Sequence, residues 1–484
     1  MSGGVWPPRQ ALEETLVGVE GRLAAEPADL QARFDRAKLL EALGRNEDAQ
    51  QAYFAVLELD PRHFGTLNNL GNLFHRMGYG AASHAAYEEA VKWHPEHPVG
   101  HANLANAFLD LDDLDAARAH YEKAVELDPD SAEAHQGLNY VFTRLGDDER
   151  AAQHRLLGFR DRAIWFEPFR GEGIPTHALL LVSAIGGNVY THQILDDRSF
   201  LVAKVFAEAY DPSLEIPPHD FVFNAIGDAD RCRAALERAL EIVPRTRGNV
   251  VNDPAAVLRT GRVANAERLG RLEGVRTPRT VAFPKSALSE QASAAAGIAF
   301  PFLLRAPGHH TGSHFERVAN AGELAAAREK LPGNELLAIE YLDTRAADGK
   351  FRKYRVMIVD GEVYPLHLAI GSAWMLHYYT AEMEDYPAHR SEEERFLNVM
   401  PAAVGARAVA ALDAIRDELA LDYAGIDFTL DADGNVVVFE ANATMTIPAP
   451  PKGELWAYRV PAVERVLRAT KTMFERRAGR SPGG

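Results

Sequence analysis

A spacing of 34 residues runs through the first third of the chain and limits what that part can fold into. Small residues, prolines, leucines and aromatic residues each recur at this interval. The positions are Ala49, Ser83, Ala117 and Ala151; Pro61, Pro95 and Pro129; Leu70, Leu104 and Leu138; Tyr53, Tyr87 and Tyr121; and Phe74, Phe108 and Phe142. Such a period predicts stacked helix pairs, in which small residues let two helices approach and proline ends each second helix.

The repeat resembles the tetratricopeptide (TPR) family, and the likeness is clearest in "YEEAVKWHPEHP" and "YEKAVELDPDS". Three full repeats are expected over about 30–131, followed by a fourth whose second helix, 148–162, departs from the pattern. Apolar Leu12, Leu16 and Val19 predict a capping helix before them. We therefore expect a capping helix within 1–27 and an all-α TPR solenoid over 28–165.

A TPR solenoid offers a concave face to peptides or other proteins, so the resemblance implies a protein or peptide partner. The alternative is a stack that only packs against the neighbouring domain. His94, His97 and His101 lie close in the sequence, but two prolines place them around a loop between helices. Because they do not share a helical face, we do not expect a metal site there.

Charge and composition narrow the classes of partner. The formal net charge is −17, and residues 1–160 carry 26 acidic against 15 basic side chains. A phosphate backbone needs a basic face, so nucleic acid is not expected as a partner. No apolar run approaches the ~20 residues of a membrane span, the N-terminus lacks a signal-peptide pattern, and Cys232 is the single cysteine. The expectation is a cytoplasmic protein that does not enter a membrane.

From residue 172 the pattern changes to alternating strands and helices. The predicted strands are 177–187 and 220–228, and the predicted helices are 198–210 and 229–242. This order indicates a small open parallel sheet, in which ligands gather at the carboxyl ends of strands, where Asn224 and Asp228 lie. Gly186 and Gly187 do not form the GxGxxG motif of dinucleotide-binding folds.

Further on, a strand at 300–305 leads into a glycine-containing flap, "APGHHTGSHFERV". Residues 335–370 predict a strand, a polar linker and a hairpin that turns at Asp360 and Gly361. A helix is expected at about 402–420. Residues 371–400 are rich in aromatic, histidine and acidic side chains, and they form either a substrate lid or a packed surface insertion.

The segment "GIDFTLDADGNVVVFEANATM" carries oxygen-bearing side chains inside two apolar strands. Asp433-Gly434 predicts a tight two-residue turn, and this register places Asp427 opposite Glu440; a four-residue loop over 432–435 gives the same pairing. Asn442, two residues after Glu440, shares its face. Two carboxylates and an amide oxygen suit a hard cation such as Mg²⁺, and two adjacent acids without a cation would repel each other. The alternative is a solvated face.

This segment resembles the metal-binding end of the ATP-grasp superfamily, and residues 172–475 resemble its glutathione-synthetase-like and glutamate-ligase-like branch. Other matching stretches are "VVNDPAAVLRTGR", "FPFLLRAPGHHTG" and "LLAIEYLD", in the order that the family has them. The resemblance implies a multi-domain chain: the TPR solenoid, an α/β pre-ATP-grasp domain over 172–285, an α+β ATP-grasp fold over 286–475, and a flexible tail over 476–484.

The resemblance also implies residue roles. It places Mg²⁺, or Mn²⁺ as an alternative, on Asp427, Glu440 and Asn442. Adenine recognition is implied for Glu340, Tyr341 and Leu342, and ribose contact for Asp343. Phosphate contacts are implied for Arg262, Arg305 and Arg355 and for the lid glycines Gly308 and Gly312; Arg305 and Arg355 are the expected catalytic residues.

Two features depart from the family. Arg262 and Arg305 stand where lysine is common; arginine keeps the charge but has a different shape, so the pose of the nucleotide is expected to differ. The usual glycine-containing turn after Asn442 is missing, which predicts a different acceptor pocket. Candidate substrate contacts are Lys353, His367 and His377. His309, His310 and His314 are either phosphate contacts or ordinary loop histidines.

The implied reaction is the ATP-dependent joining of a carboxylate to an amine or thiol through an acyl phosphate, which needs no covalent enzyme nucleophile. A second hypothesis is a scaffold whose ATP-grasp region senses nucleotide without catalysis. An ATP-dependent kinase is a third, because fold alone does not distinguish these activities. The sequence leaves the substrates, the TPR partner and the oligomeric state open.

Overall fold

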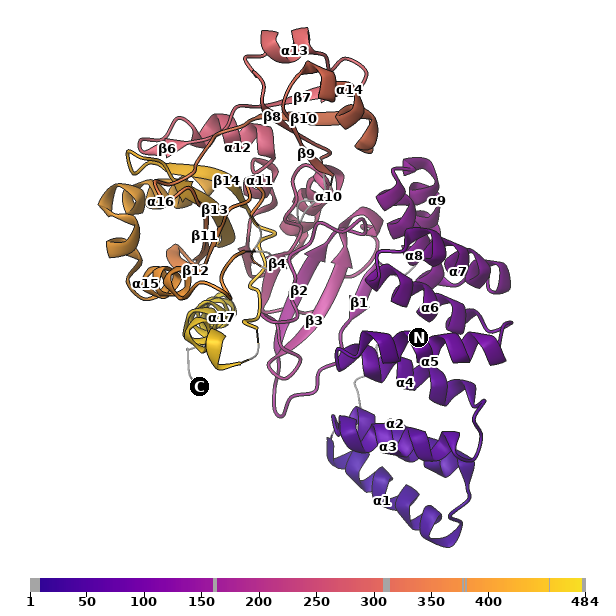
Figure 1. The fold of residues 1–484 in the computed structure, drawn as a ribbon. Helices are drawn as coiled ribbons and strands as arrows, with labels where there is room; N and C mark the ends of the chain where they lie inside the picture. Colours follow the sequence, from indigo (N-terminus) through magenta and orange to yellow (C-terminus); the bar gives the residue numbers. More distant parts are fainter. Residues whose placement is uncertain are drawn as a thin grey trace. The chain divides into compact units, whose positions relative to one another are not determined.

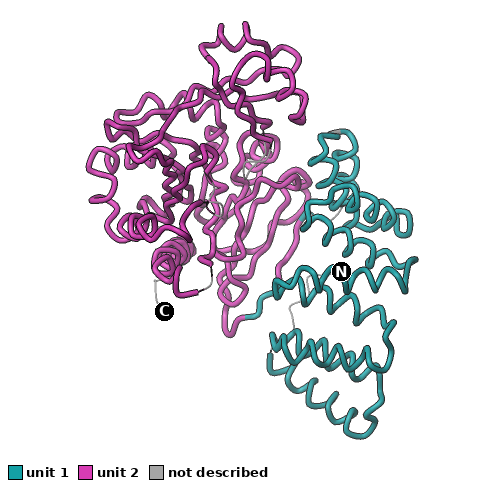
Figure 2. Tube along the Cα trace, viewed as in Figure 1, with its two compact units in different colours: residues 1–163, 168–170 teal, residues 164–167, 171–484 magenta. Residues whose placement is uncertain are grey.

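The computed structural model describes residues 9–159, 163–307, 314–376, 378, 381–451 and 453–480. The chain divides into two compact units (Figure 2). Unit 1 comprises residues 1–163 and 168–170, and unit 2 comprises residues 164–167 and 171–484.

Unit 1 is a stack of consecutive helix pairs (Figure 1). Its helices are α1 (Arg9–Ala25), α2 (Leu30–Ala42), α3 (Asn46–Leu57), α4 (Phe64–Arg76), α5 (Gly80–Trp93), α6 (Pro98–Asp110), α7 (Leu114–Leu127), α8 (Ala132–Leu145) and α9 (Asp148–Phe159). The predicted capping helix is α1, and it buries Leu12, Leu16 and Val19. The repeating small and aromatic residues form the core, as the 34-residue period predicts; Ala49, Tyr53, Ala117 and Tyr121 are buried.

The first sheet of unit 2, sheet I, has the strand order β1-β3-β2-β4-β5. Its strands are β1 (Ile164–Phe166), β2 (Thr176–Val182), β3 (Phe200–Phe206), β4 (Phe221–Asn224) and β5 (Asn249–Val251). Strands β2 to β5 are parallel, and β1 joins antiparallel to β3. A parallel sheet is therefore present, as expected.

The helix predicted at 198–210 is wrong, because residues 200–206 form strand β3. The segment "FLVAKVF" is rich in β-branched and aromatic residues, which favour a strand. Burial on both faces removes the alternation that would have marked it as one. The expected helix at 229–242 is present as α10 (Arg233–Ile242).

Two further sheets complete unit 2. Sheet II has the order β7-β10-β8-β9, with β7 (Thr280–Pro284), β8 (Phe302–Arg305), β9 (Phe315–Val318) and β10 (Glu335–Glu340). Sheet III has the order β12-β11-β13-β14-β6, with β6 (Val275–Arg276), β11 (Phe351–Val359), β12 (Glu362–Gly371), β13 (Tyr423–Leu430) and β14 (Val436–Asn442). Strands β6 and β7 lie before residue 286 but pair with strands that come after it. The domain boundary predicted at residue 286 therefore does not separate one sheet from another.

The remaining helices cover these sheets. They are α11 (Pro254–Leu258), α12 (Arg262–Leu269), α13 (Glu290–Ala295), α14 (Ala321–Lys330), α15 (Pro387–Val404), α16 (Ala406–Leu419), α17 (Val460–Arg477) and the short 3₁₀ turns Ala207–Ala209, Val243–Arg245 and Glu454–Arg459. One core joins sheets I and III with α10, α15 and α16. A second joins the same two sheets with α17, and sheet II has a core of its own with α14.

No single helix among the described residues is long and apolar enough to cross a membrane. Helices α15 and α16 pass the length and composition test only as a pair, and they meet at a bend of 96°. Both helices bury apolar side chains in the core that sheet III shares, among them Phe396 and Ile415.

Both predicted hairpins are present, but their turns differ. At Asp360 and Gly361, which both have positive φ, Val359 pairs with Glu362, so the predicted two-residue turn is confirmed. In the β13–β14 hairpin, Leu430 pairs with Val436 and the Asp431 amide donates to the Asn435 carbonyl, so the loop is one residue longer than a two-residue turn. A bulge after Asp427 offsets this difference and restores the predicted pairing of Asp427 with Glu440.

Two helix glycines give a matched test of the packing in unit 1. A Cβ on Gly71 would lie 2.4 Å from a ring carbon of Tyr87, whereas a Cβ on Gly18 would meet nothing within 4 Å. We expect Gly71→Ala to destabilise the protein because overpacking a core costs about 1–3 kcal/mol. Gly18→Ala should stabilise it by up to about 1 kcal/mol through helix propensity. Urea unfolding of the full chain measures both, and equal effects of the two changes would contradict the packing described.

Candidate functional site

Four neighbouring strands of sheet III bring a row of polar side chains together. The backbone pairs His367 on β12 with Arg355 on β11, Arg355 with Asp427 on β13, and Asp427 with Glu440 on β14. Directly paired residues face the same side of a sheet. The strand periodicity therefore aligns a histidine, an arginine and two carboxylates across sheet III.

Asp427 is held by two basic side chains. Its oxygens accept from Arg355 Nε at 2.6 Å and Nη2 at 2.8 Å, and Lys353 Nζ lies 3.2 Å from Oδ2. Only 4% of the Asp427 side chain is exposed. Burial by itself raises the pKa of Asp427, but Arg355 and Lys353 outweigh it and hold that pKa well below the ordinary range. Asp427 is consequently ionised at neutral pH.

Glu440 has a separate basic partner. Arg262 Nη2 donates to Glu440 Oε1 at 2.6 Å, and Asn442 Nδ2 donates to the same oxygen at 2.9 Å. The amide oxygen of Asn442 accepts from Thr444 N and Oγ1, at 3.0 and 2.9 Å. Because a backbone N–H can only donate, these contacts fix which end of the Asn442 amide is oxygen.

The structure thus places Asp427, Glu440 and Asn442 on one face, as the register predicts, but it also supplies positive charge to both acids. The repulsion between two adjacent acids is relieved by Arg355, Lys353 and Arg262, so it does not by itself require a metal ion. Among the described residues, no group of three or more His, Cys, Asp or Glu side chains is arranged to hold a metal. The donor set fits Mg²⁺ in chemical type, since carboxylate and amide oxygens are hard ligands.

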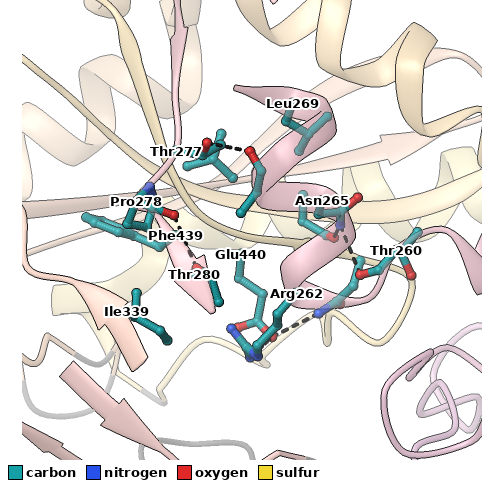
Figure 3. Close-up of a pocket in the computed structure, with 14 residues that line it drawn as sticks. Thr260, Arg262, Asn265, Leu269, Thr277, Pro278, Thr280, Ile339, Phe439 and Glu440 are labelled. Atoms are coloured by element: carbon teal, nitrogen blue, oxygen red, sulfur yellow. Dashed lines mark hydrogen bonds and ion pairs between the residues drawn. The ribbon is translucent and has the colours of Figure 1, made fainter. Parts of the chain in front are cut away.

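A pocket opens beside this row (Figure 3). It encloses about 480 Å³ of space free of protein atoms, part of which is open to solvent. Its walls come from α12, β7, β10 and β14, that is, from sheets II and III and the helix beside them. The lining residues are Thr260, Arg262, Asn265, Ala266, Leu269, Thr277, Pro278, Thr280, Ile339, Val438, Phe439, Glu440, Ala441 and Asn442. Figure 3 shows Arg262 and Glu440 converging at one end of the pocket.

The amino end of α12 is fixed by an acid in the segment between β4 and α10. The Arg262 backbone N–H donates to Asp230 Oδ2 at 3.0 Å, and a Cβ on Gly261 would lie 2.6 Å from Asp230 Oδ1, so glycine permits this close approach. Burial raises the pKa of Asp230, although the hydrogen bond from Arg262 opposes the shift. The segment between sheets I and II is thereby held where Arg262 reaches Glu440.

Arg305, at the end of β8, is 7% exposed. Burial, followed by the positive charge of Arg262, lowers the pKa of Arg305 to about 10, and the charges of Glu440 and Asp228 oppose this shift. Arg305 stays protonated at neutral pH and belongs to the same electrostatic cluster as Arg262 and Glu440.

Cys232 is unsuited to nucleophilic chemistry in this structure. Burial, and then the nearby Asp228 carboxylate, raises the pKa of the Cys232 thiol to about 12. The thiol also donates to the Gly186 carbonyl, with 3.1 Å between the heavy atoms. A protonated buried thiol is a poor nucleophile.

The predicted adenine and ribose residues are the last residue of β10, Glu340, and the three residues after it. Ile339 lines the pocket, and Glu340 accepts from the Arg279 backbone N–H at 3.1 Å. Tyr341 and Leu342 are half-buried, whereas Asp343 is exposed and bonded to Arg345. The lid glycines Gly308 and Gly312 and the loop histidines His309 and His310 lie outside the described residues. His314 is described, and its carbonyl accepts from the Ala306 amide.

The candidate substrate contacts separate in the structure. Lys353 reaches Asp427, and His377 lies outside the described residues. His367 is 1% exposed, and neither of its ring nitrogens has a hydrogen-bond partner. In the 371–400 segment, Phe396 and Leu397 are buried in the core, so the part within α15 is a packed element. Trp374, earlier in that segment, is half-buried against Phe315 and Tyr341.

Sequence reasoning missed Asn265 and Gly227. The side chain of Asn265 donates to the carbonyls of Ala441 at 2.6 Å and Thr260 at 3.0 Å, which ties α12 to the end of β14. A Cβ on Gly227 would lie 3.0 Å from the Ala443 backbone. Because Gly227 has no side chain, the turn after Asn442 can pack closely against it. That turn contains no glycine of its own. Asparagine near a helix start is a weak sequence signal, and no signal marks Gly227.

Comparison with known proteins identifies the repeats. A tetratricopeptide repeat model matches residues 34–98, and a TPR repeat model matches residues 105–146. These segments are TPR repeats, a class that generally binds protein partners. They form an N-terminal helical solenoid, which is followed by an α/β region with mixed sheets. No curated protein matches the chain.

Similar solved structures cover about a third of the chain. "MamA 41-end from Desulfovibrio magneticus RS-1" is 24% identical, with 32% of this chain and 89% of that chain covered and a TM-score of 0.29. PilF of Pseudomonas aeruginosa is 20% identical, with 31% and 68% covered and a TM-score of 0.30. PilW, titled a widely conserved type IV pilus biogenesis factor, is 20% identical, with 31% and 70% covered and a TM-score of 0.29.

The buried ion pair predicts a large effect of one substitution. Asp427→Asn would leave the Arg355 guanidinium buried without its carboxylate, which costs about 3–5 kcal/mol. Asp343→Asn is the matched control, because its pair with Arg345 is exposed and such pairs contribute about 0–1 kcal/mol. Urea unfolding at pH 7 measures both variants. A cost of less than 1 kcal/mol for Asp427→Asn would contradict the placement of this pair.

The same pair predicts the direction of the acid response. Because the folded-state pKa of Asp427 is below its ordinary value of 3.8, its stabilisation is present above that pH and is lost as the pH falls toward the folded-state value. Wild type should therefore lose more stability than Asp427→Asn when the pH is lowered from 5 through the range below 4. Parallel losses in the two proteins would contradict the shift.

Proposed function

We propose that unit 2 is an ATP- and Mg²⁺-dependent ligase that joins a carboxylate to an amine or thiol through an acyl phosphate. The observation that carries this proposal is the pocket between strands of sheets II and III, with Glu440, Asn442 and Arg262 in its wall. Residues that line the pocket come from three of the stretches that resemble ATP-grasp motifs. A carboxylate, an amide and a guanidinium at one end suit a cation and phosphates; the apolar Ile339 and the residues near it suit a base.

The residues of the chain have distinct roles in this proposal. Arg262, Arg305 and Arg355 bind phosphate oxygens, and Gly308 and Gly312 belong to the lid that excludes water. Glu340, Tyr341 and Leu342 contact the adenine, and Asp343 the ribose. Asp427, Glu440 and Asn442 hold Mg²⁺, or Mn²⁺ as an alternative; the bound cation neutralises charge on the transferred phosphoryl group. The acid–base pairs must rearrange for this, since Arg355 occupies both oxygens of Asp427.

The TPR repeats of unit 1 dock a peptide or protein in this proposal, either as the substrate or as an assembly partner. TPR stacks bind such partners by shape and surface chemistry. Unit 1 is acidic in sequence, so a partner with basic segments has the complementary charge.

A second candidate function has an observation in its favour. All three proposed metal ligands already have partners within the protein. Asp427 is paired with Arg355 and Lys353. Glu440 contacts Arg262 and Asn442, and Asn442 also contacts Thr444. Such an arrangement favours a scaffold that senses nucleotide and does not turn it over. A kinase using the same pocket is the third reading and differs only in the acceptor.

Nucleotide binding is the first test. Thermal unfolding of wild type should shift upward with Mg-ATP, because a ligand at ~100 times its Kd adds about 2.7 kcal/mol of stability. The shift should be smaller with ATP in EDTA and should be lost in Glu440→Gln. Glu335→Gln, an exposed carboxylate on β10, is the matched control and should behave as wild type. The absence of any shift with wild type would refute the proposed site.

Turnover separates the three activities. The ligase should release ADP and phosphate only when both a carboxylate and an amine or thiol are present. A kinase would yield ADP and a stable phosphorylated acceptor without free phosphate. Nucleotide binding with no ADP release for any acceptor would support the sensing scaffold. Coupled ADP detection with phosphate analysis on wild type, with Arg305→Ala as the inactive control, makes the distinction.

A further inference from the structure

Two histidine pairs recur in unit 1 with the same geometry. His101 Nδ1 lies 3.0 Å from His120 Nδ1, and His135 Nδ1 lies 2.8 Å from His154 Nδ1. The members of one pair are each 34 residues from those of the other, so both pairs occupy the same positions in successive repeats. The first pair joins α6 to α7, and the second joins α8 to α9.

A backbone carbonyl fixes the protons of each pair. His101 Nε2 lies 2.8 Å from the Pro95 carbonyl, and His135 Nε2 lies 2.9 Å from the Pro129 carbonyl. A carbonyl only accepts, so each Nε2 carries hydrogen and, in the neutral ring, each facing Nδ1 is an acceptor. His120 and His154 must therefore donate from their own Nδ1 atoms.

This arrangement limits the number of protons that a pair can hold. A first extra proton on Nε2 of His120 leaves its Nδ1–H donating to His101. A second, on Nδ1 of His101, would set two N–H groups against each other and break the contact. Each intact pair therefore excludes at least one proton that two separate histidines would bind in acid.

The surroundings of each pair oppose added charge. His101 and His135 are buried, and the rings of His120 and His154 stack on Phe108 and Phe142 at centroid distances of 5.4 and 5.5 Å. Besides the pair partners, the groups that act on His120 and His154 are His84 on α5, which lies 3.3 Å from Glu88, and Arg150, which is on the same helix as His154. Neither His84 nor Arg150 is an acid, so neither stabilises a protonated pair.

The pKa values of His120 and His154 are shifted in the same direction. Burial first, and then His101 and His84, lower the pKa of His120 below its ordinary value of 6.5. Burial, His135 and Arg150 do the same for His154. Because unfolded histidines take up protons at a higher pH than these folded ones, stability is full above about 6.5 and falls as the pH drops below it.

We propose that the two histidine pairs make the second half of the TPR stack pH-responsive, holding α6 against α7 and α8 against α9 at neutral pH and releasing them on mild acidification. The partner surface that these helices form would be lost in the same range. The first half of the stack has no histidine pair at these positions, because Leu67 and Ala86 stand where His101 and His120 stand one repeat later.

Hydrogen exchange on the full chain tests the proposal, with rates corrected for the intrinsic effect of pH. Between pH 7.5 and 5.5, protection in residues 98–159 should fall by about tenfold per pH unit below the histidine pKa for each excluded proton. Protection in residues 30–93 should change much less and serves as the internal control. Equal changes in both segments, or none, would overturn the proposal.

The chain offers its own matched variant. His101→Leu with His120→Ala, and His135→Leu with His154→Ala, place at both pairs the residues found at Leu67 and Ala86, and should abolish the extra pH dependence. If that protein does not fold, His120→Asn with His154→Asn keeps a donor that does not titrate and should flatten the dependence. His75→Ala removes an exposed histidine outside the two pairs and should leave the extra pH dependence unchanged. An undiminished pH effect in a folded variant lacking the pairs would refute the proposal.

Discussion

The ion pair between Arg355 and Asp427 is the contact on which the arrangement of unit 2 around its pocket depends. A buried carboxylate is costly unless it is paired, and the two parallel hydrogen bonds from one guanidinium meet this requirement with a fixed geometry. The pairing requires one register between β11 and β13. A shift of one residue would turn Asp427 to the opposite face and leave both charges without a partner.

From this pair, polar contacts extend to the other parts of unit 2. The bulge beside Asp427 keeps Glu440 opposite it, and Glu440 holds the side chain of Arg262. The backbone of Arg262 is held by Asp230, which follows β4 of sheet I. Asn265, one turn further along α12, bonds to the end of β14. Helix α12 is thus fixed both to the segment after β4 and to the end of β14, and its first turn becomes a wall of the pocket.

Unit 1 is stabilised in a different way. Its helices contact mainly their neighbours along the chain, so each repeat depends on local packing of small residues against aromatic rings. Polar contacts between helices are added in places, and some recur from repeat to repeat, the histidine pairs among them. Each histidine pair lies within one pair of consecutive helices, so its loosening acts on the local packing of unit 1.

The sequence by itself determined the repeat architecture, the parallel character of sheet I and the meeting of Asp427 with Glu440, because these follow from periodicity and turn chemistry. The meeting of Asp427 with Glu440 was predicted from a loop of the wrong length. The actual loop is one residue longer than a two-residue turn, and a bulge that no local pattern marks offsets the extra residue. The sequence also missed strand β3, since burial on both faces removes alternation. Only the tertiary structure decided which charges pair with Asp427 and Glu440. Arg355 and Arg262 come from segments far away in the chain, and only the packing of sheet III and α12 brings them within hydrogen-bond distance.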